Sequence, residues 1–212
     1  DESERNRVAG MFITLEGGDG TGKSTQIALL QEWFESHGRE VVRTFEPGGS
    51  EFGKEIREIV LHSRGHIEPR SEALLYAADR AHNIATNVRP ALARGAVVIQ
   101  DRYIDSSVAY QGAGRVLDPI EIRDLSMWAT EGLVPDLTVV LDLDPVASRE
   151  RLLAENKKFD RLESQELDFH IRVRDSYLAM AAADPHRFLV VDATRDRLDI
   201  RDQIVERIGS LG

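Results

Sequence analysis

A glycine-rich stretch near the amino terminus carries the residues best suited to chemistry. Residues 17–24 read GGDGTGKS and fit the pattern G-x-x-x-x-G-K-[ST], in which glycines let backbone N–H groups converge on phosphate oxygens. The apolar run MFITLE precedes the stretch, and the helical pattern STQIALLQEWFESHG follows it. This strand–turn–helix context predicts a nucleoside triphosphate site formed by Gly17, Gly18, Asp19, Gly20, Thr21, Gly22, Lys23, Ser24 and Thr25.

Two side chains of this loop have distinct expected roles. Lys23 would reach the β and γ phosphates from the solvent side of the loop, and Ser24 could ligate Mg²⁺. The amino terminus of the following helix adds partial positive charge for the same anion. The alternative is a glycine-rich turn without function, which the register of strand and helix disfavours.

A second candidate anion site follows another apolar run. Asp101-Arg102-Tyr103 comes directly after AVVIQ, at the predicted carboxyl end of a parallel strand, where open α/β sheets bind ligands. Asp101 could hold Mg²⁺ through water, and Arg102 could clamp a phosphate with two N–H groups. A surface Asp-Arg ion pair is the alternative.

The stretch Glu46-Pro47-Gly48-Gly49 occupies the same topological position after the run VVRTF. Its composition predicts a sharp turn over the same cleft. Arg57 lies one helix later and could face this cleft. Judged alone, however, Arg57 is better interpreted as a solvated helix residue.

Composition limits the class of protein. The chain has 212 residues, of which 42% are hydrophobic, no cysteine and a net charge of −10, which argues against a nucleic-acid backbone as partner. No apolar run approaches the roughly 18 residues that span a bilayer, and the amino terminus lacks a secretory apolar segment. We expect a cytoplasmic protein without membrane contact, with a loose tail at 1–10 and a single domain at 11–212.

The hydrophobic pattern alternates between short and long periods. Five β-rich runs are expected as strands, at Phe12–Glu16, Val41–Phe45, Ala96–Gln100, Leu137–Leu141 and Phe188–Val191. Helical patterns separate them at about 23–37, 51–62, 69–94, 118–131, 145–155, 163–183 and 198–209. This alternation predicts an α/β fold with a five-stranded parallel sheet flanked by helices. A charged insert at 156–161 indicates a short mobile lid within about 150–163.

Several motifs together resemble the thymidylate kinases. They are GGDGTGKST, EPGGS followed by Gly53 and Ile56-Arg57, Tyr76-Ala77-Ala78-Asp79-Arg80, DRYIDSSVAYQG at 101–112, and Phe159-Asp160-Arg161-Leu162-Glu163. The resemblance covers about Met11 to Ala193, and DRYIDSSVAYQG is the part that other nucleoside-monophosphate kinases do not share. It implies a P-loop nucleoside-monophosphate kinase fold and transfer from ATP to dTMP with Mg²⁺, for dTTP biosynthesis.

The resemblance also implies roles for particular residues. Arg57 and Arg102 would hold the 5′-phosphate of dTMP, Tyr76 would stack on thymine, and Tyr110 would lie under the sugar. Arg80 would bind a base carbonyl, with Gln111 or Ser107 at the other polar edge of the base. The remaining dTMP residues would be Asp19, Glu46, Pro47 and Ser106, while adenine would rest between Arg149 or Arg151 and Ala193-Thr194. Without the resemblance, Tyr76 and Tyr110 could equally be core aromatics.

The chain departs from the family pattern at three positions. Phe45 stands where the family commonly has arginine, and Tyr76 stands where it usually has phenylalanine. Gly20 occupies the P-loop position at which one class of thymidylate kinases carries an arginine. The chain therefore resembles the other class, in which lid cations assist transfer, and the candidates here are Lys157, Lys158 and Arg161. Together with Lys23 and Arg102, these form the expected catalytic set.

The resemblance further implies a homodimer through the helices near 51–62, 69–94 and 118–131. Apolar residues that would permit such an interface are Val60, Leu74, Leu125 and Trp128, although core packing explains them equally well. Two other functions remain open from the residues alone. One is a deoxyribonucleoside kinase acting on an uncharged nucleoside, and the other is a P-loop module that binds ATP without turnover.

Overall fold

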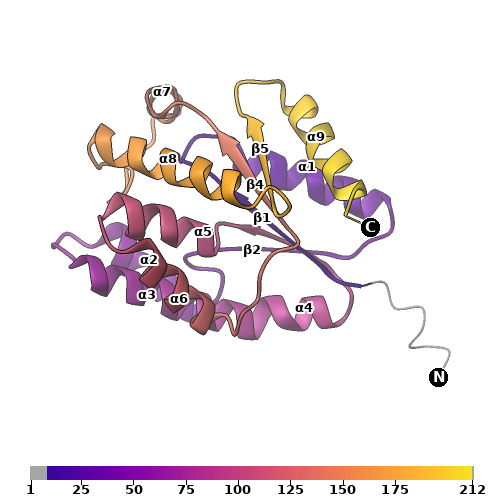
Figure 1. Cartoon of the computed structure of the whole chain (residues 1–212), viewed down its shortest axis with the longest axis horizontal. Coiled ribbons are helices and arrows are strands. Elements are labelled where there is room, and N and C mark those ends of the chain that lie inside the picture. Colours follow the sequence, from indigo (N-terminus) through magenta and orange to yellow (C-terminus); the bar gives the residue numbers. More distant parts are fainter. Residues whose placement is uncertain (1–8, 212) are drawn as a thin grey trace.

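Five short strands form one parallel sheet at the centre of the molecule (Figure 1). The computed structural model describes residues 9–211, so most of the expected amino-terminal tail, residues 1–8, lies outside the described residues. The strands are β1 (Met11–Glu16), β2 (Val41–Phe45), β3 (Val97–Asp101), β4 (Leu137–Asp142) and β5 (Phe188–Asp192). The central strands are buried almost throughout, as expected when helices cover both faces of a sheet.

The strand order is β2-β3-β1-β4-β5, and every pair is parallel. Leu15 of β1 pairs with Asp101 of β3 on one side and with Val139 of β4 on the other. The chain leaves β1 toward one edge of the sheet and, after β3, crosses to the other edge. Such a switch opens a crevice outside the carboxyl ends of the strands, where ligands bind in this class of fold. The predicted fold class is confirmed.

Helices form every connection between the strands. The α-helices are α1 (Lys23–Ser36), α2 (Glu51–His62), α3 (Pro69–Asn83), α4 (Arg89–Ala93), α5 (Ile104–Ser107), α6 (Pro119–Ala129), α7 (Pro145–Ala154), α8 (Leu167–Ala183) and α9 (Arg197–Gly209), and the π-helical segments are η1 (Ile84–Val88) and η2 (Val108–Gly114). Asp118 and Asp144 each accept a hydrogen bond from a backbone N–H of the first turn of α6 and α7, and each precedes a proline. An acidic cap followed by proline is a strong local start signal for a helix.

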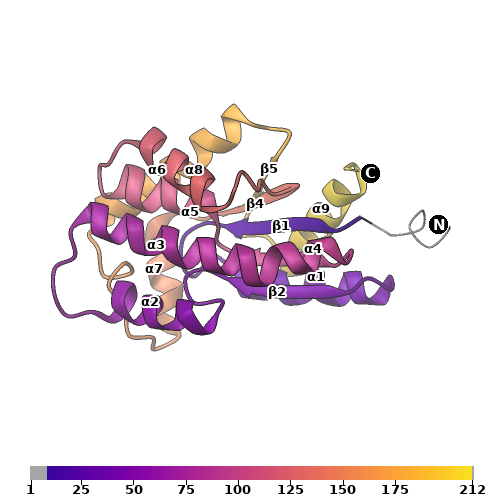
Figure 2. The same ribbon diagram turned by 90° about the horizontal axis from the view of Figure 1, so that it is seen from below.

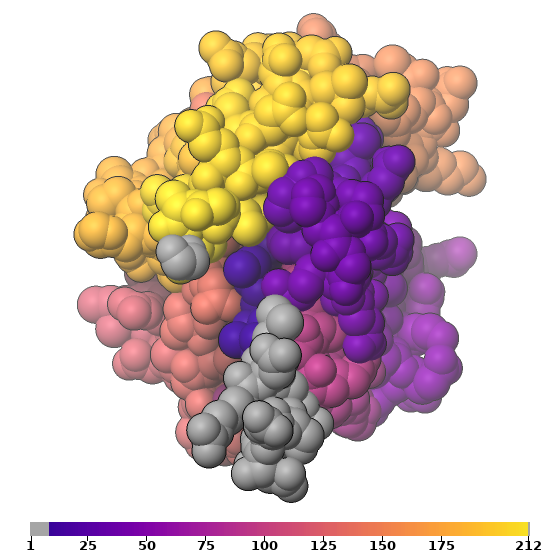
Figure 3. Space-filling view, turned by 90° about the vertical axis from the view of Figure 1, so that its right-hand side faces the viewer, coloured from indigo at the N-terminus to yellow at the C-terminus, as the bar shows by residue number. Residues whose placement is uncertain are grey.

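The two faces of the sheet have separate helical covers. Helices α1 and α9 cover one face, where Leu30, Phe34 and Ile204 pack onto inward residues of the strands. Figure 3 shows α9 lying beside α1 on the surface of this side. The run from α3 to α4, together with α6, covers the other face, and Figure 2 shows α3 and α4 as successive parts of one long helical run.

A third apolar cluster packs helices against one another and against Val140 of β4 and Phe188 of β5. It joins α2, α3, η2 and α8 through Val60, Tyr76, Tyr110, Phe169 and Tyr177. Because this cluster fixes the helices that surround the crevice, it sets the positions of the side chains that face a ligand. Among the described residues, no helix combines the length and the apolarity needed to cross a membrane.

The sequence expectations miss one element and misplace others. The stretch 104–114, which had no helix assigned, forms α5 and η2. The expected single helix at 69–94 contains the π-helical turn η1 just before Pro90, whose ring lacks an N–H and crowds the preceding turn of a regular helix. The expected helix at 163–183 begins four residues later, at Leu167.

The packing of α9 onto the sheet yields a stability prediction. Ile204 is fully buried against the strands, whereas Leu198 in the same helix is 44% exposed. Ile204→Ala should lower the free energy of unfolding by about 3 kcal/mol because it leaves a cavity, and Leu198→Ala by less than about 1 kcal/mol. Urea unfolding followed by circular dichroism measures both. Equal losses in the two variants would contradict the assigned face of α9.

Candidate active site

A cavity of about 1330 Å³, including its open mouth, lies at the carboxyl edge of the sheet. It collects side chains from segments that are far apart in the sequence. The predicted site residues that line it are Asp19, Gly20, Lys23, Ser24, Glu46, Pro47, Arg57, Tyr76, Arg80, Asp101, Arg102, Ser106, Ser107, Tyr110, Gln111, Lys157 and Lys158. Two separately predicted anion sites, the glycine-rich loop and the segment after β3, therefore open into one space.

The glycine-rich loop turns directly from β1 into α1. Gly17, Gly20 and Gly22 have φ values of 131°, 73° and 97°, a region that residues with a Cβ rarely adopt. Lys23 is the first residue of α1, and its Nζ donates to the carbonyl oxygen of Gly18 over 3.0 Å. The side chain is buried, so the expectation that it lies on the solvent side is wrong. Burial, reinforced by the positive charge of Arg102, lowers the pKa of Lys23.

Arg102 stands between this loop and the helices across the cavity. Its backbone has a φ of 66°, and its N–H donates to the Leu15 carbonyl of β1 over 3.0 Å. The guanidinium donates to Asp19 Oδ1 over 3.0 Å and to the hydroxyl of Tyr110 over 3.3 Å. Although burial would raise the pKa of Asp19, the charges of Arg102 and Lys23 hold it below its usual value. The positive charge of Arg102 thus contacts residues on both sides of the cavity.

Glu16 supports Arg102 from the end of β1, and the sequence reasoning did not identify it. Its carboxylate accepts from the backbone N–H of Tyr103 over 2.7 Å, from the hydroxyl of Tyr177 over 2.8 Å and from the hydroxyl of Ser106. Ser106 and Tyr177 also contact the Arg102 guanidinium, at 3.3 and 3.4 Å. Burial raises the pKa of Glu16 to about 7. The signal in the sequence was an acidic residue ending an otherwise apolar strand.

Arg80 reaches the cavity from α3 and is almost completely buried. Its Nε donates to Glu46 over 2.6 Å, its Nη1 to Ser107 and Ser126 over 2.9 and 3.1 Å, and its Nη2 to the Tyr103 carbonyl over 3.0 Å. Burial raises the pKa of Glu46 and Arg80 opposes that rise. These bonds use four of the five N–H groups of the guanidinium, so one Nη2 hydrogen is left for a ligand.

Arg57 reaches the cavity from α2, the helix that packs beside α3. Its Nη1 donates to the Pro47 carbonyl over 2.8 Å, and its guanidinium carbon lies 5.7 Å from the centre of the Phe45 ring. Phe45, which replaces the arginine that the resemblance led us to expect, therefore forms an aromatic support under Arg57. The side chain of Arg57 faces the cavity.

The segment between α7 and α8 covers one end of the cavity. Lys157 and Lys158 line the cavity, whereas Arg161 donates to the buried carboxylate of Glu72 on α3 and to the Val60 carbonyl over 3.3 Å. A Cβ at Gly20, where φ is 73°, would lie 3.0 Å from the carbonyl oxygen of Ser148 on α7. The close approach of α7 therefore leaves little room for the P-loop arginine of the other class.

The residues expected around adenine lie outside this cavity lining. Arg151 donates to the Ala193 carbonyl over 3.1 Å and to the Gly20 carbonyl over 3.5 Å. Arg149 instead donates to the Gln165 carbonyl over 2.9 Å and lies 5.7 Å above the Phe159 ring. Of the two arginines left open, the structure brings Arg151 beside Ala193.

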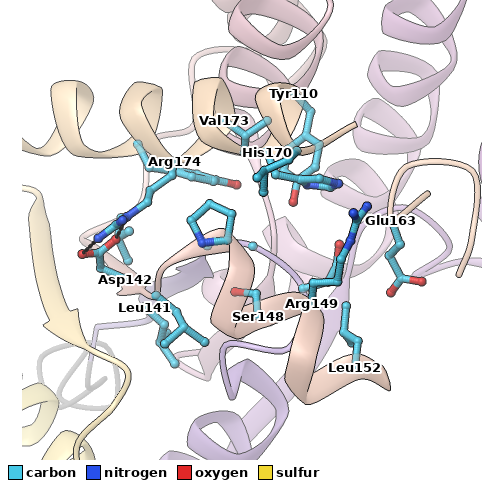
Figure 4. A pocket seen from close by; sticks show the side chains of 18 of the residues that line it. Tyr110, Leu141, Asp142, Ser148, Arg149, Leu152, Glu163, His170, Val173 and Arg174 are labelled. Carbon is cyan, nitrogen blue, oxygen red and sulfur yellow. Dashed lines mark hydrogen bonds and ion pairs between the residues drawn. The ribbon is translucent and has the colours of Figure 1, made fainter. Parts of the chain in front are cut away.

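An adjoining chamber that the sequence did not indicate lies between α7 and α8 (Figure 4). It shares Asp19, Tyr110 and Glu163 with the main cavity. Its walls are largely apolar, with Leu141, Leu152 and Val173 among them, and Arg174 closes one end through two hydrogen bonds to Asp142. Burial lowers the pKa of His170, which points into this chamber.

The donor set fits Mg²⁺. Ser24 and Asp101 line the same cavity, and Asp101 Oδ1 is a buried atom with no hydrogen-bond partner among the described residues. Residues 9–211 hold no cluster of three acidic or imidazole side chains that could bind a metal unaided. Mg²⁺ commonly takes only one or two protein oxygens and completes its shell with water and substrate phosphates. The site therefore suits a cation that arrives with a nucleotide.

Comparisons with known proteins agree on one family. The family model described as thymidylate kinase matches residues 15–204. The chain is 68% identical over 200 residues to the thymidylate kinase of Clavibacter sepedonicus, covering 94% of this chain and 95% of that protein. It is 66% identical over 195 residues to the thymidylate kinase of Leifsonia xyli subsp. xyli, covering 92% of each. It also resembles the crystal structure of thymidylate kinase from Ehrlichia chaffeensis, with a TM-score of 0.77, 31% identity, and coverage of 94% of this chain and 99% of that one.

The buried carboxyl of Asp79, next to the cavity residue Arg80 in the chain, predicts a pH effect on stability. Asp79 is fully buried and accepts a hydrogen bond from the Gly48 N–H over 3.0 Å. Burial, reinforced by the Glu46 carboxylate, raises the pKa of Asp79 from 3.8 to about 7. The folded state therefore holds this proton more tightly than the unfolded state, and its stabilising contribution is lost as the pH rises from about 4 through 7.

Asp79→Asn imitates the protonated carboxyl at every pH. Its free energy of unfolding should nearly equal that of the wild type at about pH 3.5 and exceed it by about 4 kcal/mol at pH 8, with most of the difference developing between about pH 4 and 7. Urea unfolding at several pH values measures this difference. A difference that stays constant across this range would show that Asp79 does not titrate as described.

Proposed function

The chain belongs to the thymidylate kinase family, and we propose that its cavity binds the phosphates of ATP and dTMP side by side for direct transfer. The protein is a nucleoside-monophosphate kinase that converts dTMP to dTDP with ATP as donor. The proposed arrangement rests on the position of Arg102. Its guanidinium donates hydrogen bonds both to Asp19 of the P-loop and to Tyr110 across the cavity.

The donor side uses the glycine-rich loop. Backbone N–H groups of residues 17–25 and the amino terminus of α1 hold the phosphates of ATP, and Lys23 exchanges the Gly18 carbonyl for phosphate oxygens. Ser24 and Asp101 would hold Mg²⁺, Asp101 through water, and the bound cation would supply positive charge that neutralises the transferred group. Arg151 and Ala193 flank the adenine.

The acceptor side lies beneath α2, α3 and η2. Arg57 and Arg102 bind the 5′-phosphate of dTMP and direct one of its oxygens at the γ-phosphorus for in-line attack. Tyr76 stacks on thymine, and the free Nη2 hydrogen of Arg80 is offered to a base carbonyl. Tyr110 packs against the sugar, which rejects a 2′-hydroxyl both by its bulk and by giving it no partner.

A substrate panel tests this proposal. Coupled ADP-release assays with dTMP, dUMP, UMP, CMP, AMP and thymidine should give the highest kcat/KM for dTMP. Activity with thymidine but not dTMP would select a deoxyribonucleoside kinase, which has no need for both Arg57 and Arg102. ATP binding without turnover on any acceptor would select the regulatory module.

The phosphate role of Lys23 gives the first functional prediction. Lys23→Ala should lower kcat by at least about 10²-fold because it removes a fixed positive charge from the transferred group. Since Lys23 is buried, Lys23→Met serves as a variant that keeps more of the packing. Steady-state kinetics, with thermal unfolding to verify folding, provide the measurement. Turnover near that of the wild type in both folded variants would overturn the P-loop assignment.

The lid cations give a second prediction. Lys157→Ala together with Lys158→Ala should lower kcat by on the order of 10³-fold, with a much smaller change in the dissociation constant of ATP, because the charge matters most in the transition state. Arg161→Ala is the companion variant, since Arg161 pairs with Glu72 here. If all three alanines together left kcat within a few-fold of the wild type, an arginine from outside the lid would have to supply the charge.

We also propose a homodimer through α2, α3 and α6. Val60 is fully buried in one apolar cluster and is not available for an interface, and Leu125 is partly buried against another cluster. Leu74 and Trp128 remain candidates, because they are 58% and 81% exposed on α3 and α6.

A charge substitution on this surface tests the dimer. Sedimentation at micromolar concentration should give a dimer for the wild type and a monomer for Trp128→Glu, because an unpaired charge cannot be buried cheaply. Val146→Glu, at a half-exposed position of α7, is the control and should leave the dimer intact. A monomeric wild type would refute the assignment.

A further inference from the structure

The carboxylate of Glu72 on α3 is completely buried beside the cavity. It accepts a hydrogen bond from Gln111 Nε2 over 3.2 Å and two from Arg115, over 3.1 and 3.3 Å. Arg161 of the lid segment donates to its second oxygen. Four N–H groups from three side chains thus converge on one carboxylate.

Glu72 is an acceptor without hydrogens to donate. Burial by itself would raise the pKa of Glu72, but the hydrogen bonds from Arg115 and Arg161 outweigh burial and lower it. The group is therefore ionised at neutral pH, and both of its oxygens can only accept.

This constraint fixes one end of the Gln111 carboxamide. The NH₂ group of Gln111 must face Glu72, because the reversed amide would place its oxygen against a carboxylate oxygen. Gln111 Oε1 then points away from Glu72. This oxygen has no hydrogen-bond partner among residues 9–211, and it is not a fully buried atom. Gln111 lines the cavity, so the amide offers the cavity an acceptor.

Helix α3 and segment η2 place the oxygen of Gln111 near Tyr76, where the base is expected. Tyr76 lies four residues after Glu72 on α3, which places both on one face of the helix. Gln111 lies beside Tyr110 in η2, and the N–H of Arg115 donates to the Tyr110 carbonyl over 2.9 Å. An aromatic face and an oriented amide oxygen therefore flank the same part of the cavity.

We propose that Glu72 is a positioning residue for base selection, which orients Gln111 so that the site accepts a base with a ring N–H and rejects a base with a bare ring nitrogen. Thymine presents N3–H to Gln111 Oε1, whereas cytosine presents a lone pair to the same oxygen. The inference rests on the proposed function, because it requires the base to lie beside Tyr76 and Gln111.

The test is the ratio of kcat/KM for dTMP to that for dCMP. In Glu72→Gln the residue facing Gln111 can donate as well as accept, so Gln111 can present either end of its amide. The ratio should fall at least about tenfold, the effect of one hydrogen bond to a charged group. A purely structural role of Glu72 would lower both values together and leave the ratio unchanged.

Arg115→Gln is the matched control, because it removes part of the same buried ion pair and leaves Glu72 an acceptor. Its ratio should stay within about twofold of the wild type. A fall as large as that in Glu72→Gln would mean that the cluster acts only through packing, and would overturn the inference. An unchanged ratio in folded Glu72→Gln would overturn it as well.

A second variant covers the case in which Glu72→Gln does not fold. Gln111→Leu deprives thymine N3–H of its acceptor and removes the oxygen that opposes cytosine, so the ratio should again fall at least about tenfold. An unchanged ratio in folded Gln111→Leu would exclude Gln111 as the selecting group. A wild type that fails to phosphorylate dTMP would refute the proposed function itself, whereas a wild type active on dTMP with unchanged ratios in the variants would refute only this inference.

Discussion

The arrangement of the site depends on the hydrogen bonds of the Arg102 guanidinium. They join Asp19 of the P-loop to Tyr110 on the other side of the cavity. The left-handed backbone of Arg102 turns the side chain from the end of β3 toward Asp19 and Tyr110, and such a conformation persists only where its surroundings enforce it. Glu16 does so by binding the backbone N–H of Tyr103 and the hydroxyls that contact Arg102. A bound phosphate can therefore replace Asp19 as the partner of a cation that is already in place.

The sheet topology makes this contact possible. Since β1 and β3 are parallel neighbours, the residues that follow them begin at the same edge, and Leu15 pairs with Asp101. The short helix α5 and the wider turns of η2 then carry Tyr110 and Gln111 back over the crevice. π-Helical turns often occur at functional sites, where they redirect side chains that a regular helix would space differently. The acceptor wall is thus set by an element with an irregular backbone, which continues directly from α5, and Ser106 of α5 is bound to Glu16 at the end of β1.

The sequence allows the fold and many of the residues that line the cavity to be predicted, but not the groups that hold those residues in place. The P-loop and the residues after β3 follow local patterns, and the cavity brings Lys23, Arg80 and Arg102 together. Glu16 and Glu72 have no local pattern, because their partners lie 161 and 89 positions away in Tyr177 and Arg161. The helix at 104–114 was missed because its serines and glycines are typical of loops in isolation. Burial and distant carboxylates, rather than helix propensity, stabilise it.

The Glu72 cluster also bears on how the lid can assist transfer. Arg161 is one of the three lid cations that the resemblance indicated, but it already neutralises a buried carboxylate together with Arg115. To face the transferred phosphate it would have to leave that carboxylate with one fewer partner in a buried setting, which costs several kcal/mol when a buried ion pair is broken. Lys157 and Lys158 line the cavity on an exposed segment, so their approach to a phosphate costs mainly side-chain entropy. The energetics therefore favour separate roles for these cations. Arg161 holds the segment between α7 and α8 against α3, and Lys157 and Lys158 are the cations that can move toward a phosphate.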